Sequence, residues 1–271
     1  MRTATTMLLA LVTVGVVHAG GAPDADEIIR RSTAANRADW AASPNFDYTE
    51  QVRDDDGVKT YEVAMLFGTP YKRLIGINGH PLSPDRREQE RRKLADERTK
   101  RRDESSSERA KRIGDYQEDR ERAHQIIDEM PRAFRYRLRR TQRTGGRTVY
   151  VLDAIPREGY NPPTVAAKVL TGMRGEFWID ADSFHWAKAT AWAVRAVSIA
   201  GPLARVEPGT EFSVEQMPVE QGVWLPRHYQ IRSHSRILGV FTHHMHEEHT
   251  YSNYHRIRAA DADSNRVPQP R

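Results

Sequence analysis

The chain has 271 residues, a formal net charge of +5, 38% hydrophobic residues and no cysteine. Without cysteine there can be no disulfide, no thiolate metal site and no cysteine nucleophile. The small charge surplus does not indicate a nucleic-acid partner, and it predicts at most a weak attraction to anionic lipid head groups or acidic proteins.

Residues 1–19 have the pattern of a secretory signal peptide. Arg2 gives a positive start, residues 7–17 are an apolar run, and Val17-His18-Ala19 has the form of a cleavage site. The run is shorter than the ~20 apolar residues of a membrane-spanning helix. No cysteine follows the cleavage site, so no lipid anchor is expected. These features predict a soluble, periplasmic or secreted protein that does not span a membrane.

One helix and then an antiparallel meander are expected next. Residues 24–42 carry acidic residues at their start and an uneven apolar stripe, which predicts a helix. Asp56-Gly57 is a strong hairpin-turn signal. Alternating apolar residues on either side of such turns predict three strands at 46–53, 58–67 and 71–77.

Residues 84–130 are expected to form a long charged helical insertion. Ser83 is a candidate N-cap before Pro84, and Ser105 with Glu108 forms a candidate capping box that starts a second helix. Opposite charges recur four residues apart and support a helix. Because acidic and basic residues are nearly balanced, the pattern favours a solvated helical hairpin projecting from the sheet over an arm that binds polyanions.

Strand patterns resume after Pro131. Alternation predicts two strands before a short helix at 164–173, and three more follow a loop at 199–208. The five strands are expected at 134–141, 147–155, 210–217, 222–233 and 236–251. The polar tail at 259–271 is expected to be disordered.

The segment Gly175 to Arg195 is expected to form a central hairpin. Phe177-Trp178-Ile179 has the composition of a strand and ends at Asp180, after which Asp182 and Ser183 supply turn chemistry. Strict alternation from Phe184 to Val194 then predicts a return strand, with Trp186 and Trp192 on one face and a row of alanines on the other.

The residues Gly175, Phe177, Trp178, Ile179 and Asp180, followed by a turn and a long strand, resemble the middle of periplasmic outer-membrane lipoprotein-sorting proteins, the LolA-like group. This resemblance implies an incomplete β-barrel whose concave side is capped by helices. We therefore expect an α+β fold with a large, strongly curved antiparallel sheet, forming a single domain over residues 20–258 that carries the charged insertion.

In such a half-barrel the concave face would be an apolar cleft, which could hold a lipid, an acyl chain or a lipoprotein. The candidate ligand-binding residues are aromatic or aliphatic, namely Phe177, Ile179, Trp186, Trp192, Trp224 and Tyr229. Neither a Gly-x-Ser-x-Gly elbow nor a phosphate-binding glycine loop is present. The main hypothesis is therefore an exported, non-catalytic binding protein without a cofactor.

Two alternatives remain open. The protein could act as an envelope scaffold or sensor that contacts a protein partner through its charged helical hairpin.

The other alternative is a zinc or copper site at His243–His249, completed by His228 or His234 on the preceding strand. Side chains two residues apart on one strand are ~6–7 Å from each other, which is awkward for a tetrahedral ion. A solvated strand face is therefore favoured, and no metal is predicted.

Overall fold

The computed structural model describes residues 24–198, 204–237 and 241–257. The predicted signal peptide and the predicted disordered tail lie outside these residues. The helices are α1 (Ala25–Ala42), α2 (Pro84–Arg102) and α3 (Ser106–Ala133), with 3₁₀ turns η1 (Ser43–Asn45) and η2 (Ala166–Gly172). The strands are β1 (Phe46–Asp54), β2 (Gly57–Leu66), β3 (Thr69–Ile77), β4 (His80–Pro81), β5 (Phe134–Thr144), β6 (Arg147–Pro156), β7 (Met173–Asp180), β8 (Trp186–Ala193), β9 (Val197–Ser198), β10 (Ala204–Val206), β11 (Glu211–Glu220), β12 (Val223–Ile237) and β13 (Phe241–Arg256).

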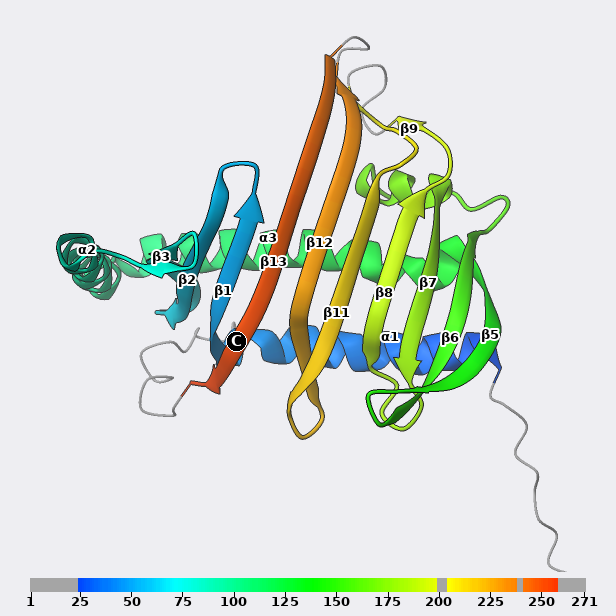
Figure 1. The fold of residues 1–271 in the computed structure, drawn as a ribbon, viewed down its shortest axis with the longest axis horizontal. Coiled ribbons are helices and arrows are strands. Elements are labelled where there is room, and N and C mark those ends of the chain that lie inside the picture. The colour runs from blue at the N-terminus through cyan, green and yellow to red at the C-terminus, as the bar shows by residue number, and fades with distance from the viewer. Residues whose placement is uncertain (1–23, 199–203, 238–240, 258–271) are drawn as a thin grey trace, which may run out of the picture.

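The thirteen strands within the described residues form one sheet, in which β1 pairs with β13 and so joins the start of the chain to its end. The main path runs β4-β3-β2-β1-β13-β12-β11-β8-β7-β6-β5, and its neighbours are antiparallel. Strands β4 and β5 stand at opposite ends of this path, so the sheet is open (Figure 1). The predicted α+β class with a half-open, curved antiparallel sheet is confirmed.

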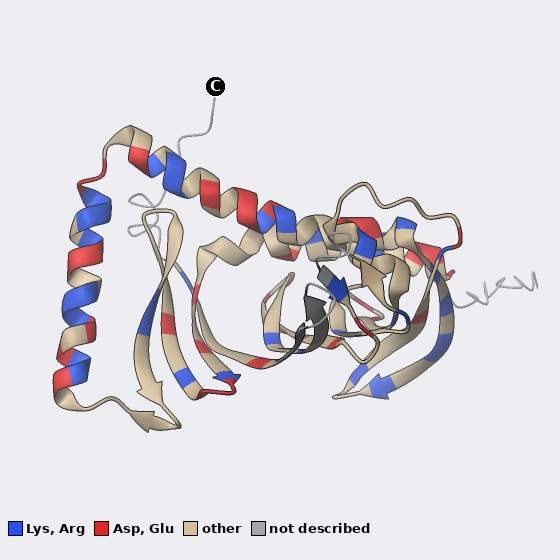
Figure 2. Ribbon diagram, turned by 90° about the horizontal axis from the view of Figure 1, so that it is seen from above, with Lys and Arg blue, Asp and Glu red and all other residues tan. Residues whose placement is uncertain are grey.

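Helices α1 and α3 lie across the concave side of the sheet (Figure 1), and the sheet curls beneath α3 when seen from above (Figure 2). Helix α3 reaches from β3 at one end of the sheet to β5 at the other. The core fills the space between these helices and the half of the sheet formed by β5 to β8. It contains Ile28, Ile29, Met130, Ala133, Phe134, Leu152, Ala154, Leu170, Phe177, Ile179, Phe184, Trp186 and Ala189.

Turn chemistry fixes the predicted β1–β2 hairpin. The Asp54 carboxylate accepts a hydrogen bond from the backbone N–H of Asp56 at 2.9 Å, and Gly57 follows with φ of 122°. A Cβ on Gly57 would come within 2.7 Å of the side-chain oxygen of Asn78, which accepts the Val58 N–H. Glycine is therefore required here by both its backbone angle and the close approach of a neighbouring turn.

Helix caps in the charged insertion are those predicted. Ser83 accepts from the N–H of Arg86, and Ser105 and Glu108 form a capping box. The second helix, which was expected to end at Met130, instead continues through Pro131 to Ala133. Met130 and Ala133 are both buried in the core, so packing holds this last turn against the breaking effect of proline. The prediction of a solvated hairpin therefore describes α2 better than the C-terminal half of α3.

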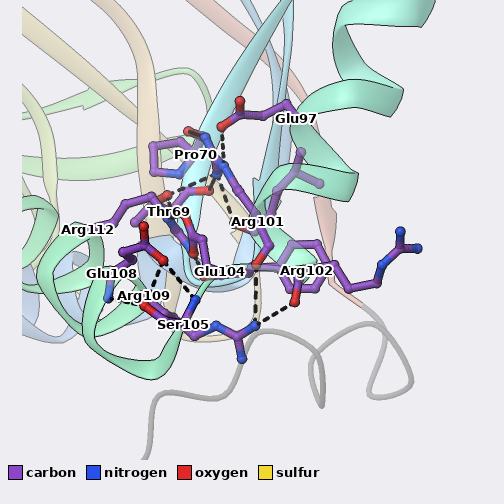
Figure 3. Close-up of polar contacts among 12 residues, drawn as sticks. Thr69, Pro70, Glu97, Arg101, Arg102, Glu104, Ser105, Glu108, Arg109 and Arg112 are labelled. Atoms are coloured by element: carbon purple, nitrogen blue, oxygen red, sulfur yellow. Dashed lines mark hydrogen bonds and ion pairs between the residues drawn. The ribbon is translucent and has the colours of Figure 1, made fainter.

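Two arginines fasten α2 and α3 to the turn between β2 and β3, and we call Arg101 and Arg112 with their partners the arginine latch (Figure 3). Arg101 is 7% exposed and donates to the carbonyls of Leu66 and Thr69 at 3.0 and 2.9 Å. Its Nε also donates to Glu97. Arg112 donates to the carbonyl of Phe67 at 3.1 Å, to the Thr69 hydroxyl and to Glu104. The latch thus satisfies the hydrogen-bonding groups of both the helices and the turn.

The central hairpin has the predicted turn but not the predicted faces. Asp180 is fully buried, and its Oδ1 accepts from the backbone N–H and the hydroxyl of Ser183 at 2.9 and 2.8 Å. Trp178 pairs with Lys188 whereas Ile179 pairs with Trp186, so β8 carries one extra residue at a bulge. The extra residue shifts the alternation, as a β-bulge does. The expectation that Trp186 and Trp192 share a face is therefore wrong: Trp186 packs in the core and Trp192 lies half-buried on the convex face.

Candidate ligand-binding cavity

A cavity of about 230 Å³ lies between α1, α3 and strands β8, β11 and β12 on the concave side. We call it the tryptophan cavity. It is lined by Asn36, Asp39, Trp40, Ser43, His124, Ile127, Trp186, Val214, Gln216, Trp224, Leu225 and Pro226. Three of the five tryptophans of the chain contribute to it.

The walls of the tryptophan cavity hold buried polar atoms that have no hydrogen-bond partner among the described residues. They are Oδ2 of Asp39, both ring nitrogens of His124, Nε1 of Trp186 and Oε1 of Gln216. Leaving such a group unsatisfied costs about 1–3 kcal/mol, and most buried polar groups in proteins are paired. The residues that line the cavity therefore include both donors and acceptors without a hydrogen-bond partner in the described structure.

Asp39 is anchored on one side only. Its Oδ1 accepts the backbone N–H of Trp224 at 2.8 Å, and Nε2 of His185 lies 3.4 Å from the same oxygen. His185 stacks on Trp224 with ring centroids 5.4 Å apart, which fixes the imidazole. The second carboxylate oxygen, Oδ2, is buried and has no hydrogen-bond partner among the described residues, and Asp39 as a whole is only 2% exposed.

His124 lies opposite, on α3, and stacks on Trp40 of α1 with ring centroids 4.7 Å apart. Its Nε2 is 3.5 Å from Asp128 but forms no hydrogen bond there. Burial lowers the pKa of His124 below that of an ordinary histidine, with Asp128 opposing the shift. A neutral imidazole has one donor nitrogen and one acceptor nitrogen, so His124 presents one of each.

Arg120 does not itself line the tryptophan cavity but contacts two residues that do, Trp40 and Ser43. Its guanidinium lies 4.4 Å above the Trp40 ring and 5.6 Å from that of Tyr116. It donates to the Trp40 carbonyl and, at 3.1 Å, to the Ser43 hydroxyl. Burial lowers the pKa of Arg120 from its usual value, although a guanidinium stays charged in proteins. No carboxylate of the described residues forms an ion pair with it.

A separate polar cluster occupies the part of the sheet formed by β1, β3 and β13. His249 contacts Glu50 through Nδ1 and Glu247 through Nε2, each at 2.8 Å, and Lys72 lies 2.5 Å from Glu50. The hydrogen bond to Glu50 raises the pKa of His249, although burial opposes the shift. Burial alone would raise the pKa of Glu50, but bonds from His249 and Lys72 outweigh it and lower that pKa. This cluster is charged but internally paired.

The residues predicted to bind a ligand are divided among four places. Trp186 and Trp224 line the tryptophan cavity. Phe177 and Ile179 are buried in the core beside it, and Trp192 is on the convex face. Tyr229 lies on β12 against His249, with ring centroids 5.7 Å apart.

The predicted metal cluster is only partly described. The last two strands were expected to be separated at 234–235, but β12 extends to Ile237 and β13 begins at Phe241. His234 is therefore in β12 and pairs with His244 in β13. The side chains of His234, His243 and His244 lie outside the described residues. His246 is exposed, and His249 is held between two carboxylates. Within the described chain no three His, Asp or Glu residues are arranged to hold a metal ion.

Sequence reasoning missed Asp39, Arg120, His124 and Gln216. A signal was available for Asp39: Ser32, Asn36 and Asp39 follow Ile28 at helical spacing, and all four are buried. A helix whose core-facing stripe changes from apolar to polar is an indication of an internal polar site. Arg120 and His124 were hidden in a segment whose charges predict only solvated helix.

No family model and no curated protein matches this sequence. Among solved structures, the chain is similar to a LolA superfamily protein from Nitrosomonas europaea, with 12% identity over 88% of this chain and 94% of that one and a TM-score of 0.34. It is also similar to a putative outer membrane lipoprotein-sorting protein domain from Vibrio parahaemolyticus, with 8% identity, coverage of 89% and 98%, and a TM-score of 0.34.

A third similar structure is the MucA/MucB complex of Pseudomonas aeruginosa, with 12% identity, coverage of 90% and 97%, and a TM-score of 0.27. The first two names belong to the group that the Gly175–Asp180 segment resembles. Values this low carry no information about ligand or activity. Among the described residues, no helix has the length and apolar character to cross a membrane.

Proposed function

We propose that the protein is an exported, non-catalytic binding protein that takes one end of a lipid or of a lipidated partner into the tryptophan cavity. The observation that carries this proposal is the set of buried polar atoms without partners on the walls of an aromatic cavity. A core that served packing alone would have satisfied these atoms or replaced them with apolar groups.

The composition and size of the cavity support an amphiphilic ligand. Trp40, Trp186 and Trp224 provide apolar wall area, while Asp39 and Gln216 provide acceptors. Pockets that hold a whole drug-sized ligand have volumes of roughly 300–1,000 Å³. A cavity of about 230 Å³ is smaller than this and suits one end of a longer molecule.

Filling the cavity tests the proposal. Val214 lines it from β11, so Val214→Phe would occupy part of its volume. The matched control is Ser213→Phe, because Ser213 is the neighbouring residue and points to the other face of the same strand. Protein released from the periplasm would be examined by native mass spectrometry with lipid extraction, and by uptake of a fluorescent acyl probe.

We expect wild type and Ser213→Phe to carry lipid and to bind the probe, and Val214→Phe to bind it at least tenfold more weakly. Absence of both co-purified lipid and probe uptake in wild type would contradict the carrier function. Equal binding by Val214→Phe and Ser213→Phe would place the ligand elsewhere.

A second candidate function is contact with an envelope protein through α2. Arg101 is the one buried residue of this helix, and the arginine latch holds α2 in place while both signs of charge cover its exposed surface. Reversing the exposed charges of Arg91, Lys93 and Asp96 would abolish cross-linking to such a partner and leave lipid binding intact. Unchanged cross-linking would count against this function.

A further inference from the structure

One carboxylate, Asp39, lines the tryptophan cavity, and one guanidinium, Arg120, lies against two residues that line it. Neither forms an ion pair with a Lys, Arg, Asp or Glu of the described residues. Asp39 is 2% exposed, and its Oδ2 has no hydrogen-bond partner. His185 is the cationic candidate nearest to it, 3.4 Å from the other oxygen, and no Lys or Arg of the described residues pairs with Asp39. A buried carboxylate in this state favours a cation or a strong donor beside it.

Arg120 differs from Arg101 and Arg112, the two arginines of the latch, and resembles Arg109, which also contacts only carbonyls and an aromatic ring. Arg101 pairs with Glu97 and Arg112 with Glu104, each at 2.6 Å. Arg120 contacts only a carbonyl, a hydroxyl and two aromatic rings among the described residues. Its positive charge is therefore available to an anion at the edge of the cavity.

The two uncompensated charges belong to one site but do not neutralise each other. Asp39 and Trp40 are adjacent on α1, and both line the cavity; Arg120 lies against the Trp40 ring and bonds Ser43, which lines it too. Asp39 and Arg120 form no ion pair with each other. A purely anionic group would be repelled by Asp39, and a purely cationic group by Arg120.

We propose, building on the binding function above, that the cavity selects a zwitterionic group, with a primary ammonium at Asp39 and a phosphate or carboxylate at Arg120. The acceptors favour a primary ammonium over a quaternary one, because Oδ2 of Asp39 and Oε1 of Gln216 both lack a donor and an ammonium has three N–H groups. The tryptophan rings add favourable cation–π contact. The phosphoethanolamine head group of a phospholipid has this chemistry, and so does a free amino acid or free phosphoethanolamine.

Short-chain phospholipids that differ only in the head group test this inference. Dihexanoyl phosphatidylethanolamine, phosphatidylcholine and phosphatidylglycerol would be titrated as monomers into the full-length mature protein by calorimetry, with free O-phosphoethanolamine and glycine in parallel. We expect phosphatidylethanolamine to bind about tenfold or more tightly than the other two lipids, the size of effect that hydrogen bonds to charged groups give.

Substitutions at Asp39 and Arg120 test which residue binds the ammonium of the ligand and which binds its anionic group. Asp39→Asn keeps the acceptor for the Trp224 N–H and should remove the preference for phosphatidylethanolamine over phosphatidylglycerol. Arg120→Gln should weaken all three lipids about tenfold, and Arg120→Lys should retain part of the binding. Arg122→Gln is the matched control, because Arg122 is on the same helix but exposed and paired with Glu118 and Asp119.

The preference of wild type needs no variant and so remains informative if a variant fails to fold. Equal binding of phosphatidylethanolamine and either other lipid would overturn the zwitterion inference and leave the lipid-binding function standing. Binding of free O-phosphoethanolamine as tight as that of the lipid would support the zwitterion and contradict a lipid ligand. If no probe binds and no lipid co-purifies, the proposed function fails and the inference with it.

Discussion

The arginine latch and the tryptophan cavity are both polar, both largely buried, and both lie along α3, yet their polar groups are in opposite states. In the latch, Arg101 and Arg112 donate hydrogen bonds to carbonyls, a hydroxyl and carboxylates. In the cavity, four side chains keep buried atoms without a partner in the described structure. The latch therefore contributes to folding, whereas the polar atoms of the cavity are those that we propose a ligand satisfies.

Breaking the latch should give the largest effect. Arg101→Met removes the donors of three buried carbonyl and hydroxyl groups and leaves Glu97 without its partner. Removing one member of a buried ion pair costs about 3–5 kcal/mol, and we expect a loss of that size in the free energy of unfolding, measured by urea denaturation. The control Arg102→Met changes an exposed residue paired with Asp103 and should alter it by less than about 0.5 kcal/mol. Equal effects would mean that the latch is not structural.

A change in the cavity should have the opposite sign. His124→Phe keeps an aromatic ring against Trp40 and removes two buried nitrogens that lack partners. We expect the ligand-free protein to gain about 1–3 kcal/mol of stability, seen as a higher Tm, and to bind its ligand more weakly. His255→Phe, at an exposed position of β13, is the control. Loss of stability in the ligand-free His124→Phe protein would show that these nitrogens are already satisfied.

The smallest effect is expected from pH, acting on the paired cluster around His249. Because Glu50 and Glu247 raise the pKa of His249, the folded state holds its proton more tightly than the unfolded chain. This contribution to stability is complete below the ordinary histidine pKa of about 6.5 and is lost as the pH rises through the raised value. His249→Gln should flatten the decline in Tm from about pH 6.5 upward, and exposed His246→Gln should not. An unchanged slope in His249→Gln would assign the decline to other groups.

Local chemistry made much of the fold predictable from sequence. Ser83, Ser105 with Glu108, and Asp180 with Ser183 act through neighbours in the chain, and each forms the predicted contact. The bulge at Ala187 was not predictable, because it depends on how β8 is registered against β7. One extra residue was enough to separate Trp186 from Trp192.

The cavity was predictable only in outline. Two of the six residues predicted to bind a ligand, Trp186 and Trp224, line the cavity. Asp39 and Arg120 could not be identified from the sequence. What distinguishes them is that the described structure gives Asp39 Oδ2 no hydrogen-bond partner and Arg120 no carboxylate partner, and the sequence does not show this. The cavity is formed by α1, α3 and β11, which are far apart in sequence. Their side chains meet only once the helices pack on the sheet.

Trp186 allows the most direct test of the claim that the cavity keeps open hydrogen-bonding groups for a ligand. Its indole N–H is buried without a partner in the described structure and belongs to a residue that lines the cavity, whereas Trp192 lies on the convex face. Five indole N–H signals are expected in a nitrogen–proton NMR spectrum of the five tryptophans. On titration with dihexanoyl phosphatidylethanolamine or phosphatidylglycerol, the Trp186 signal should move downfield as its N–H gains an acceptor, while the Trp192 signal stays in place. Saturable lipid binding that leaves the Trp186 signal unmoved would contradict the account.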